Sequence, residues 1–89
     1  MRVTVRLIGA PRVGLGFKER DFEAADGTNV AGLIAQIVEE VGRKAATYLL
    51  GAGGRGYAVV VVVNGESSTP EAALADGDVV ILMPQTAGG

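Results

Sequence analysis

Two stretches near the start of the chain alternate between hydrophobic and polar residues. In residues 2–8 the valines and the leucine share one side, and arginine and threonine share the other, which is typical of a half-buried β-strand. Residues 17–23 also alternate, but charges stand on both sides. We therefore predict a return strand at the edge of a sheet, where charges discourage edge-to-edge association. Between them, the Gly9-Ala10-Pro11 break and the glycines at 14 and 16 predict a loop.

The pattern changes to a helical period after a turn at Asp26-Gly27. Apolar residues at spacings of three and four predict one amphipathic helix, and its stripe consists of Val30, Leu33, Ile34, Ile37, Val38 and Val41. Thr28 or Asn29 is placed to cap the start of this helix, and Gly42 is placed to end it. The segment from Ala45 to Leu50 predicts a further helical turn.

A second pair of strands is predicted in the last third of the chain. The unbroken apolar run from Ala58 to Val63 is typical of a strand in the middle of a sheet, and Asn64-Gly65 is a strong turn signal. Thr69 to Leu74 resembles a capped single helical turn with proline at its first position. An Asp-Gly-Asp turn then leads into a strand from Val79 to Met83. The predicted order is β-β-α-β-β, with one helix against one sheet.

The glycine-rich segment from Gly51 to Gly56 is a candidate phosphate cradle. A phosphate-binding loop follows a strand, opens a helix and ends on Lys-Ser or Lys-Thr. Here a strand follows the segment and no such pair is present. We therefore interpret it as a flexible loop.

The composition narrows the class of function. The chain has 89 residues, 48% of them hydrophobic and 20% charged, which is typical of one globular domain. Its formal net charge of -2 disfavours nucleic acid or an anionic membrane as a partner. No transmembrane run or signal peptide is recognisable, which predicts a cytoplasmic protein. The chain contains no His and no Cys, so we expect no bound metal and disfavour an enzyme that acts alone.

The end of the chain, Pro84-Gln85-Thr86-Ala87-Gly88-Gly89, follows directly on the last predicted strand. Pro84 has no N–H and is expected to end that strand at Met83, so we predict a domain over residues 1–84 and a flexible tail over residues 85–89. The two glycines lack a Cβ, which lets another protein's backbone approach closely. Fully extended, the tail reaches roughly 17 Å beyond Pro84. A frayed terminus is the alternative interpretation.

The order and spacing of these features resemble one family. The features are Val63-Asn64-Gly65-Glu66, then Leu74-x-Asp76-Gly77-Asp78-x-Val80, an apolar run, Pro84 and Gly88-Gly89. Over nearly the whole chain they resemble the β-grasp sulfur-carrier proteins, namely the small subunit of molybdopterin synthase (MoaD type) and the thiazole sulfur carrier (ThiS type). The resemblance implies an α+β, ubiquitin-like β-grasp fold, with a mixed four- to five-stranded sheet and one main helix packed on one face. The length of residues 43–57 favours the molybdopterin type, although Gln85 stands where that type more often has a second proline.

The same resemblance implies a mechanism. An E1-like activating enzyme adenylates the Gly89 carboxylate with ATP and Mg²⁺, a sulfur donor displaces AMP, and the tail carries the thiocarboxylate to an acceptor enzyme. The acceptor is the large subunit of molybdopterin synthase for one type and thiazole synthase for the other. The partners would recognise the tail residues Pro84, Gln85, Thr86, Ala87 and Gly88, and this chain would bind no cofactor itself.

Other interpretations stay open at the level of sequence. A ubiquitin-like modifier would join Gly89 to a target lysine, and a non-covalent interaction domain would bind without any chemistry at its terminus. The apolar strands at 59–63 and 79–83 predict an exposed docking patch if one helix does not cover them, and the alternative is that all of them are core. We interpret the charges of Arg2, Arg6, Glu19 and Asp21 as a solvated sheet face rather than a docking site.

Overall fold

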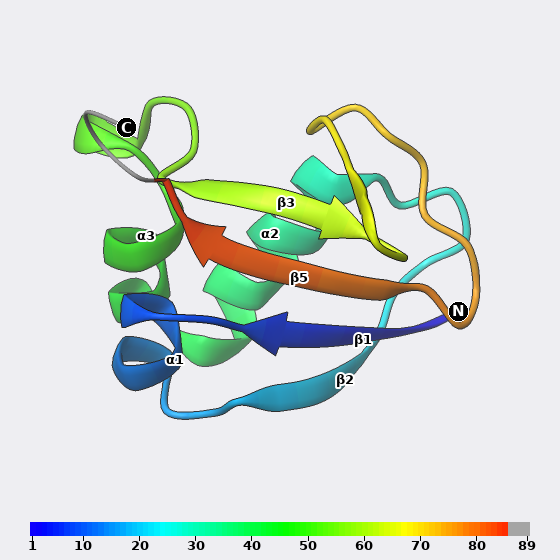
Figure 1. Cartoon of the computed structure of the whole chain (residues 1–89), viewed down its shortest axis with the longest axis horizontal. Helices are drawn as coiled ribbons and strands as arrows, with labels where there is room; N and C mark the ends of the chain where they lie inside the picture. The colour runs from blue at the N-terminus through cyan, green and yellow to red at the C-terminus, as the bar shows by residue number, and fades with distance from the viewer. Residues whose placement is uncertain (86–89) are drawn as a thin grey trace.

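A computed structural model describes residues 1–85, and a five-stranded mixed sheet forms its centre (Figure 1). The strands are β1 (Arg2–Leu7), β2 (Glu19–Glu23), β3 (Val59–Val63), β4 (Glu66–Ser67) and β5 (Val79–Pro84). They lie in the order β2-β1-β5-β3-β4, so the predicted edge position of the charged strand β2 is confirmed. β5 runs parallel to β1 and antiparallel to β3. The last strand of the chain therefore lies in the middle of the sheet.

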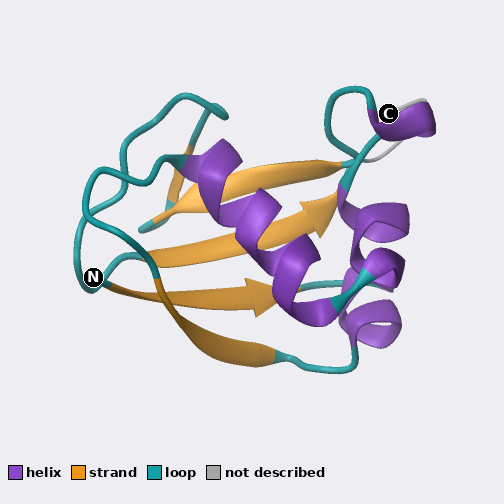
Figure 2. Cartoon of the chain, turned by 180° about the vertical axis from the view of Figure 1, so that it is seen from behind, coloured by secondary structure: helices purple, strands orange, loops and turns teal. Residues whose placement is uncertain are grey.

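The helix α2 (Val30–Val41) crosses one face of this sheet (Figure 2). It begins as predicted, because the Asn29 side chain accepts a hydrogen bond from the Gly32 N–H at 2.8 Å and so satisfies one free donor of the first turn. Its buried side chains are Val30, Leu33, Ile34 and Ile37. Burial of each is worth about 1.5–3 kcal/mol before chain entropy is subtracted. The one main helix predicted from the spacing is confirmed.

Two shorter helices stand at one end of the sheet, and the first of them corrects the loop expected between the first two strands. The helix α1 (Ala10–Leu15) packs against α3 (Arg43–Leu49). Gly14 lies inside α1, where a Cβ would overlap the ring of Tyr48. This glycine permits close packing of two helices and does not mark a loop. Pro11 stands in the first turn, where its missing N–H breaks no helical hydrogen bond.

The segment between β4 and β5 is also less regular than predicted. Thr69–Leu74 forms a turn, in which the Ala72 N–H donates to the Thr69 carbonyl at 3.1 Å, and no helix is present there. The Pro70 carbonyl accepts a hydrogen bond from the Ala31 N–H at 2.9 Å. Carbonyl groups that would accept bonds within a longer helical segment are thus bonded to the start of α2, which explains why the segment stops at one turn.

The core lies between α2 and the sheet. Its buried strand residues are Val3, Val5, Leu7, Phe22, Val59, Val61, Val80 and Leu82. Within the described part of the chain, none of the helices combines the length and the apolarity needed to cross a bilayer.

Candidate functional site

The predicted tail begins where β5 ends, at the same end of the sheet as α1 and α3 (Figure 1). β5 includes Pro84, one residue beyond the end predicted from the sequence. The Ile8 N–H donates to the Leu82 carbonyl at 3.1 Å on one side of β5, and the Gln85 N–H donates to the Ala58 carbonyl at 3.1 Å on the other. Because strand hydrogen bonds alternate between sides, the Pro84 nitrogen faces the β1 side beyond the end of β1. The missing N–H therefore breaks no pairing.

Pro84 is packed as well as paired. A Cβ on Gly9 would lie 3.0 Å from Pro84 Cγ, and Gly9 has a φ of 75°, a conformation that favours glycine. The strand is thus held at its last residue by the start of α1. Of the predicted tail, Pro84 and Gln85 are described, whereas Thr86, Ala87, Gly88 and Gly89 lie outside the described residues, so their roles stay predictions.

One face of the sheet has no helix of the described chain over it (Figures 1 and 2), and the half formed by β2 and β1 is polar. Three pairs cross between the strands there: Arg2–Glu23 at 3.2 Å, Thr4–Asp21 at 2.7 Å and Arg6–Glu19 at 2.7 Å. Directly opposed charges of opposite sign stabilise an antiparallel pair. The interpretation of these charges as a solvated sheet face agrees with their exposure and their mutual pairing.

The other half of this face, formed by β5 and β3, is apolar. We call Val60, Val62, Ile81 and Met83 the open apolar patch. Val60 lies opposite Met83 and Val62 opposite Ile81 in the strand register. Val60 is 40% exposed, whereas its neighbour Val61 is 6% exposed on the covered face. The apolar strands thus leave a partly exposed surface, in which Val60 is exposed and Val62, Ile81 and Met83 are half-buried, and it runs along β5 to within two residues of Gln85. Its use for docking stays a prediction.

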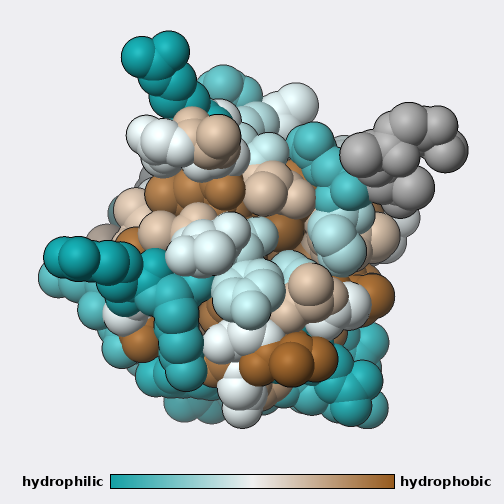
Figure 3. All heavy atoms as spheres, turned by 90° about the vertical axis from the view of Figure 1, so that its left-hand side faces the viewer, coloured by the Kyte–Doolittle hydropathy of each residue, from teal (hydrophilic) through white to brown (hydrophobic). Residues whose placement is uncertain are grey.

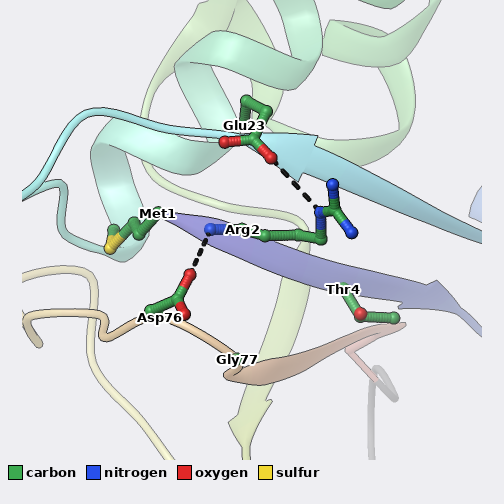
Figure 4. A pocket seen from close by; sticks show the side chains of 6 residues that line it. All are labelled: Met1, Arg2, Thr4, Glu23, Asp76 and Gly77. Atoms are coloured by element: carbon green, nitrogen blue, oxygen red, sulfur yellow. Dashed lines mark hydrogen bonds and ion pairs between the residues drawn. The ribbon is translucent and has the colours of Figure 1, made fainter.

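A hollow of about 470 Å³ lies at the far end of β1 from the tail (Figure 4). The Arg2 N–H donates to the Asp76 carboxylate at 2.7 Å, and Arg2 Nε donates to Glu23 at 3.2 Å. Met1, Thr4 and Gly77 complete the lining. These groups engage each other and hold the start of β1. The Thr4 hydroxyl of this lining donates to the Asp21 carboxylate at 2.7 Å, which is one of the cross-strand pairs described above.

The loop from Gly51 to Gly56 contains one 3-10 turn, η1 (Ala52–Gly54). It is closed by a bridge between Leu50 and Tyr57, directly before Ala58, whose carbonyl accepts the hydrogen bond from Gln85. Sequence analysis did not predict that α1 and this loop would flank the root of the tail. The only local signal for α1 is Pro11 followed at helical spacing by Leu15, both of which are buried.

Comparisons with known proteins agree with this geometry. The sequence model of the ThiS family matches residues 5–89. No curated protein sequence matches the chain.

Solved structures give the same fold over the whole length. SAMP1 from Haloferax volcanii superposes with a TM-score of 0.86 at 21% identity, with 100% of both chains covered. A putative molybdopterin converting factor, subunit 1, from Pyrococcus furiosus gives a TM-score of 0.80 at 29% identity and covers 97% of this chain and 99% of its own. A chain of the BexX/CysO complex from Amycolatopsis orientalis gives 0.68 at 25% identity, covering 98% and 99%. The predicted ubiquitin-like β-grasp fold is confirmed.

Proposed function

Because the chain belongs to the ThiS family, we propose that it is a sulfur carrier whose Gly89 carboxyl group is adenylated by an E1-like enzyme and converted to a thiocarboxylate. The carrier then hands the sulfur to the large subunit of molybdopterin synthase. The observation that carries the proposal is the family match, which runs without interruption from β1 through Gly89. The 29% identity to the Pyrococcus furiosus protein favours the molybdopterin branch over thiazole synthesis.

In this reaction the chain has to supply only an accessible acyl group at its C-terminus. A carboxylate is a poor acyl donor, and its mixed anhydride with AMP supplies the leaving group that a sulfur nucleophile needs. The chain contains no His and no Cys, so ATP, Mg²⁺ and acid–base groups belong to the partner. The folded domain is then the part that partners recognise, and the segment after Pro84 carries the reactive group.

The open apolar patch is a surface through which a partner could bind the body of the carrier. Apolar surface left open on a small protein is typical of a protein interface. The patch and the tail share one strand, because Ile81 and Met83 precede Gln85 on β5. A partner that docks on the patch therefore binds at a fixed distance from the start of the tail. The pairing of β5 with β3 fixes the position of the patch residues relative to that point.

Intact mass spectrometry tests the proposal. The purified chain is mixed with a candidate E1-like enzyme, ATP, Mg²⁺ and a sulfide-level sulfur donor. We expect the mass to rise by the difference between one sulfur and one oxygen atom. Deletion of Gly89 should abolish the conversion. Glu66→Gln, a change of one exposed side chain on β4, should leave the conversion unchanged. Conversion that is equally efficient without Gly89 would contradict the proposal.

Further outcomes separate the alternatives. Isopeptide-linked conjugates through Gly89 in cells would favour a protein modifier. Partner binding that ignores the loss of Gly89 would favour a non-covalent interaction domain. Sulfur transfer to thiazole synthase but not to the large subunit of molybdopterin synthase would favour the thiazole branch.

A further inference from the structure

A second hollow, of about 320 Å³, lies beside the root of the tail. Three of its lining residues are cations from three different elements: Arg6 of β1, Arg12 of α1 and Lys18 just before β2. Apolar side chains form the rest, and the accessible ones are Ile8, which is 49% exposed, and Ile81, which is half-buried. Figure 3 looks onto this end of the molecule and shows hydrophobic surface between protruding hydrophilic side chains.

The backbone fixes these cations next to the tail. The Lys18 carbonyl accepts a hydrogen bond from the Leu7 N–H at 2.9 Å, and the Gly9 carbonyl accepts one from the Arg12 N–H at 3.1 Å. Gly9 itself packs on the Pro84 ring. Arg12 therefore lies one helical turn from Gly9, and Gly9 packs on Pro84, the residue before the tail.

The hollow carries an excess of positive charge. Arg6 Nε is paired with Glu19 Oε1 at 2.7 Å. Among the described residues, no carboxylate lies within ion-pair distance of Arg12 or Lys18, and none lines the hollow. Both cations are exposed, so they are available to an outside group.

The opposite end of β1 has the opposite character. Asp76 accepts a hydrogen bond from the Arg2 N–H at 2.7 Å, Glu23 pairs with the Arg2 side chain, and Asp26 lies 3.5 Å from the N-terminal nitrogen of Met1. The chain as a whole carries a net charge of -2. Its tail-bearing end is nevertheless locally positive, so the molecule presents a charge gradient along β1.

We infer that this hollow is a docking site for an acidic segment, with one apolar side chain, of the activating enzyme that binds the tail. The inference rests on the proposed function, because it concerns the partner that handles Gly89. Arg12 and Lys18 would bind the carboxylates, and the surface of Ile8 and Ile81 would cover the apolar side chain. An inorganic anion would use only the cations and would leave the apolar surface in water. The mixed lining therefore favours a peptide segment.

This site would orient the carrier during encounter. Complementary charge at an interface raises the association rate and selects one approach, and salt screens it over about 8–10 Å at moderate ionic strength. A partner with acidic residues around its tail-binding channel would thus attract the end of the carrier that bears the tail and repel the other end.

The first test measures activation by the E1-like enzyme at low salt as a function of carrier concentration. The double variant R12E/K18E should raise the apparent KM by about tenfold or more and leave kcat unchanged, and added salt should shrink the difference. The matched control is R43E/K44E, which changes the net charge equally on exposed residues of α3 at the same end of the molecule but outside the hollow, so it should raise the apparent KM by less. Equal KM values for the two double variants would overturn the inference. A wild-type chain that is never activated would instead overturn the proposed function.

A second test needs no activating enzyme and no altered carrier. The wild-type chain is titrated with the synthetic peptide Glu-Asp-Leu-Glu-Asp, and amide NMR shifts are followed. We expect saturable shifts at Leu7, Gly9 and Lys18, which weaken when the peptide's leucine is replaced by serine and vanish with Lys-Lys-Leu-Lys-Lys. Shifts of equal size with inorganic phosphate or ATP would identify a simple anion site. That outcome, or no shifts with the acidic peptide, would refute the inference.

Discussion

The two faces of the sheet are built from the same strands but differ in burial and in the side chains that they present. On the face under α2, successive odd residues of β1, Val3, Val5 and Leu7, are at most 2% exposed. On the open face, the even residues of β1 pair with β2, and the alternate residues of β3 and β5 form the open apolar patch. Because side chains alternate along a strand, adjacent residues lie on faces that differ in burial. The covered face stabilises the fold, and the open face leaves apolar side chains partly exposed; their use by partners stays a prediction.

The largest difference between the two faces is expected for two neighbouring valines of β3. Val61 is 6% exposed on the covered face and Val60 is 40% exposed on the open face. Val61→Ala should lower the free energy of unfolding by about 1.5–3 kcal/mol, because it removes buried methyl groups and leaves a cavity. Val60→Ala should lower it by less than about 1 kcal/mol, because the valine is only partly removed from water. Urea denaturation measures both values.

The two variants make the same substitution in the same strand, so they differ in the face on which the side chain is shortened. Equal destabilisation would show that the open face is as important for folding as the covered face. In the activation assay, Val60→Ala should instead raise the apparent KM, whereas Val61→Ala should leave it unchanged at temperatures where the variant is folded.

A smaller effect is expected at the start of the covering helix. Asn29→Ala removes the side-chain acceptor for the Gly32 N–H and should cost about 1 kcal/mol, within the range of 0.5–2 kcal/mol seen for such caps. Asn29→Asp keeps the acceptor and serves as the control. Thermal unfolding followed by circular dichroism compares the two. If both variants lost the same stability, the hydrogen bond at the cap would not be the cause.

The smallest effect should come from the polar half of the open face. Arg2 and Glu23 form a pair with side chains that are 67% and 71% exposed. A double-mutant cycle with Arg2→Gln and Glu23→Gln should give a coupling energy of about 0.2–1 kcal/mol. The coupling should fall as salt is added. A larger, salt-insensitive coupling would mean that this pair is part of the structural core after all.

Most of the fold could be predicted because its elements are periodic. The alternation of residues 2–8 and the apolar stripe of α2 predicted, without tertiary information, which side of each element faces the core. The run Val59–Val63 was different, since five similar residues show no alternation. Only the register against β5 decides that Val60 faces outward and Val61 inward. Sequence predicted that an exposed patch would exist if the helix did not cover both strands, but it did not identify its members.

The missed helix has a specific cause. Gly14 and Gly16 suggested a loop, and Gly16 does end α1 in a left-handed conformation, as a helix-terminating glycine does. Gly14, however, is a glycine because Tyr48 of α3 packs on it. Contacts between elements so far apart in sequence leave no local signal.

The candidate site also contains one part that the sequence predicted and one part that it did not. Pro84 and the residues after it were recognisable from their order along the chain. The hollow beside the tail could not be predicted, because Arg6 of β1, Arg12 of α1 and Lys18 just before β2 are brought together only by the fold.

The central position of β5 has a consequence for the synthesis of the chain. Of the described strands, β5 is the last to be synthesised, yet β1 and β3 pair on either side of it. Nascent chains that stop before residue 79 cannot bridge the two halves of the sheet, and parallel pairing between distant segments forms late in folding. An activating enzyme of the kind proposed should therefore meet a folded chain only after translation has reached the strand that leads into the tail.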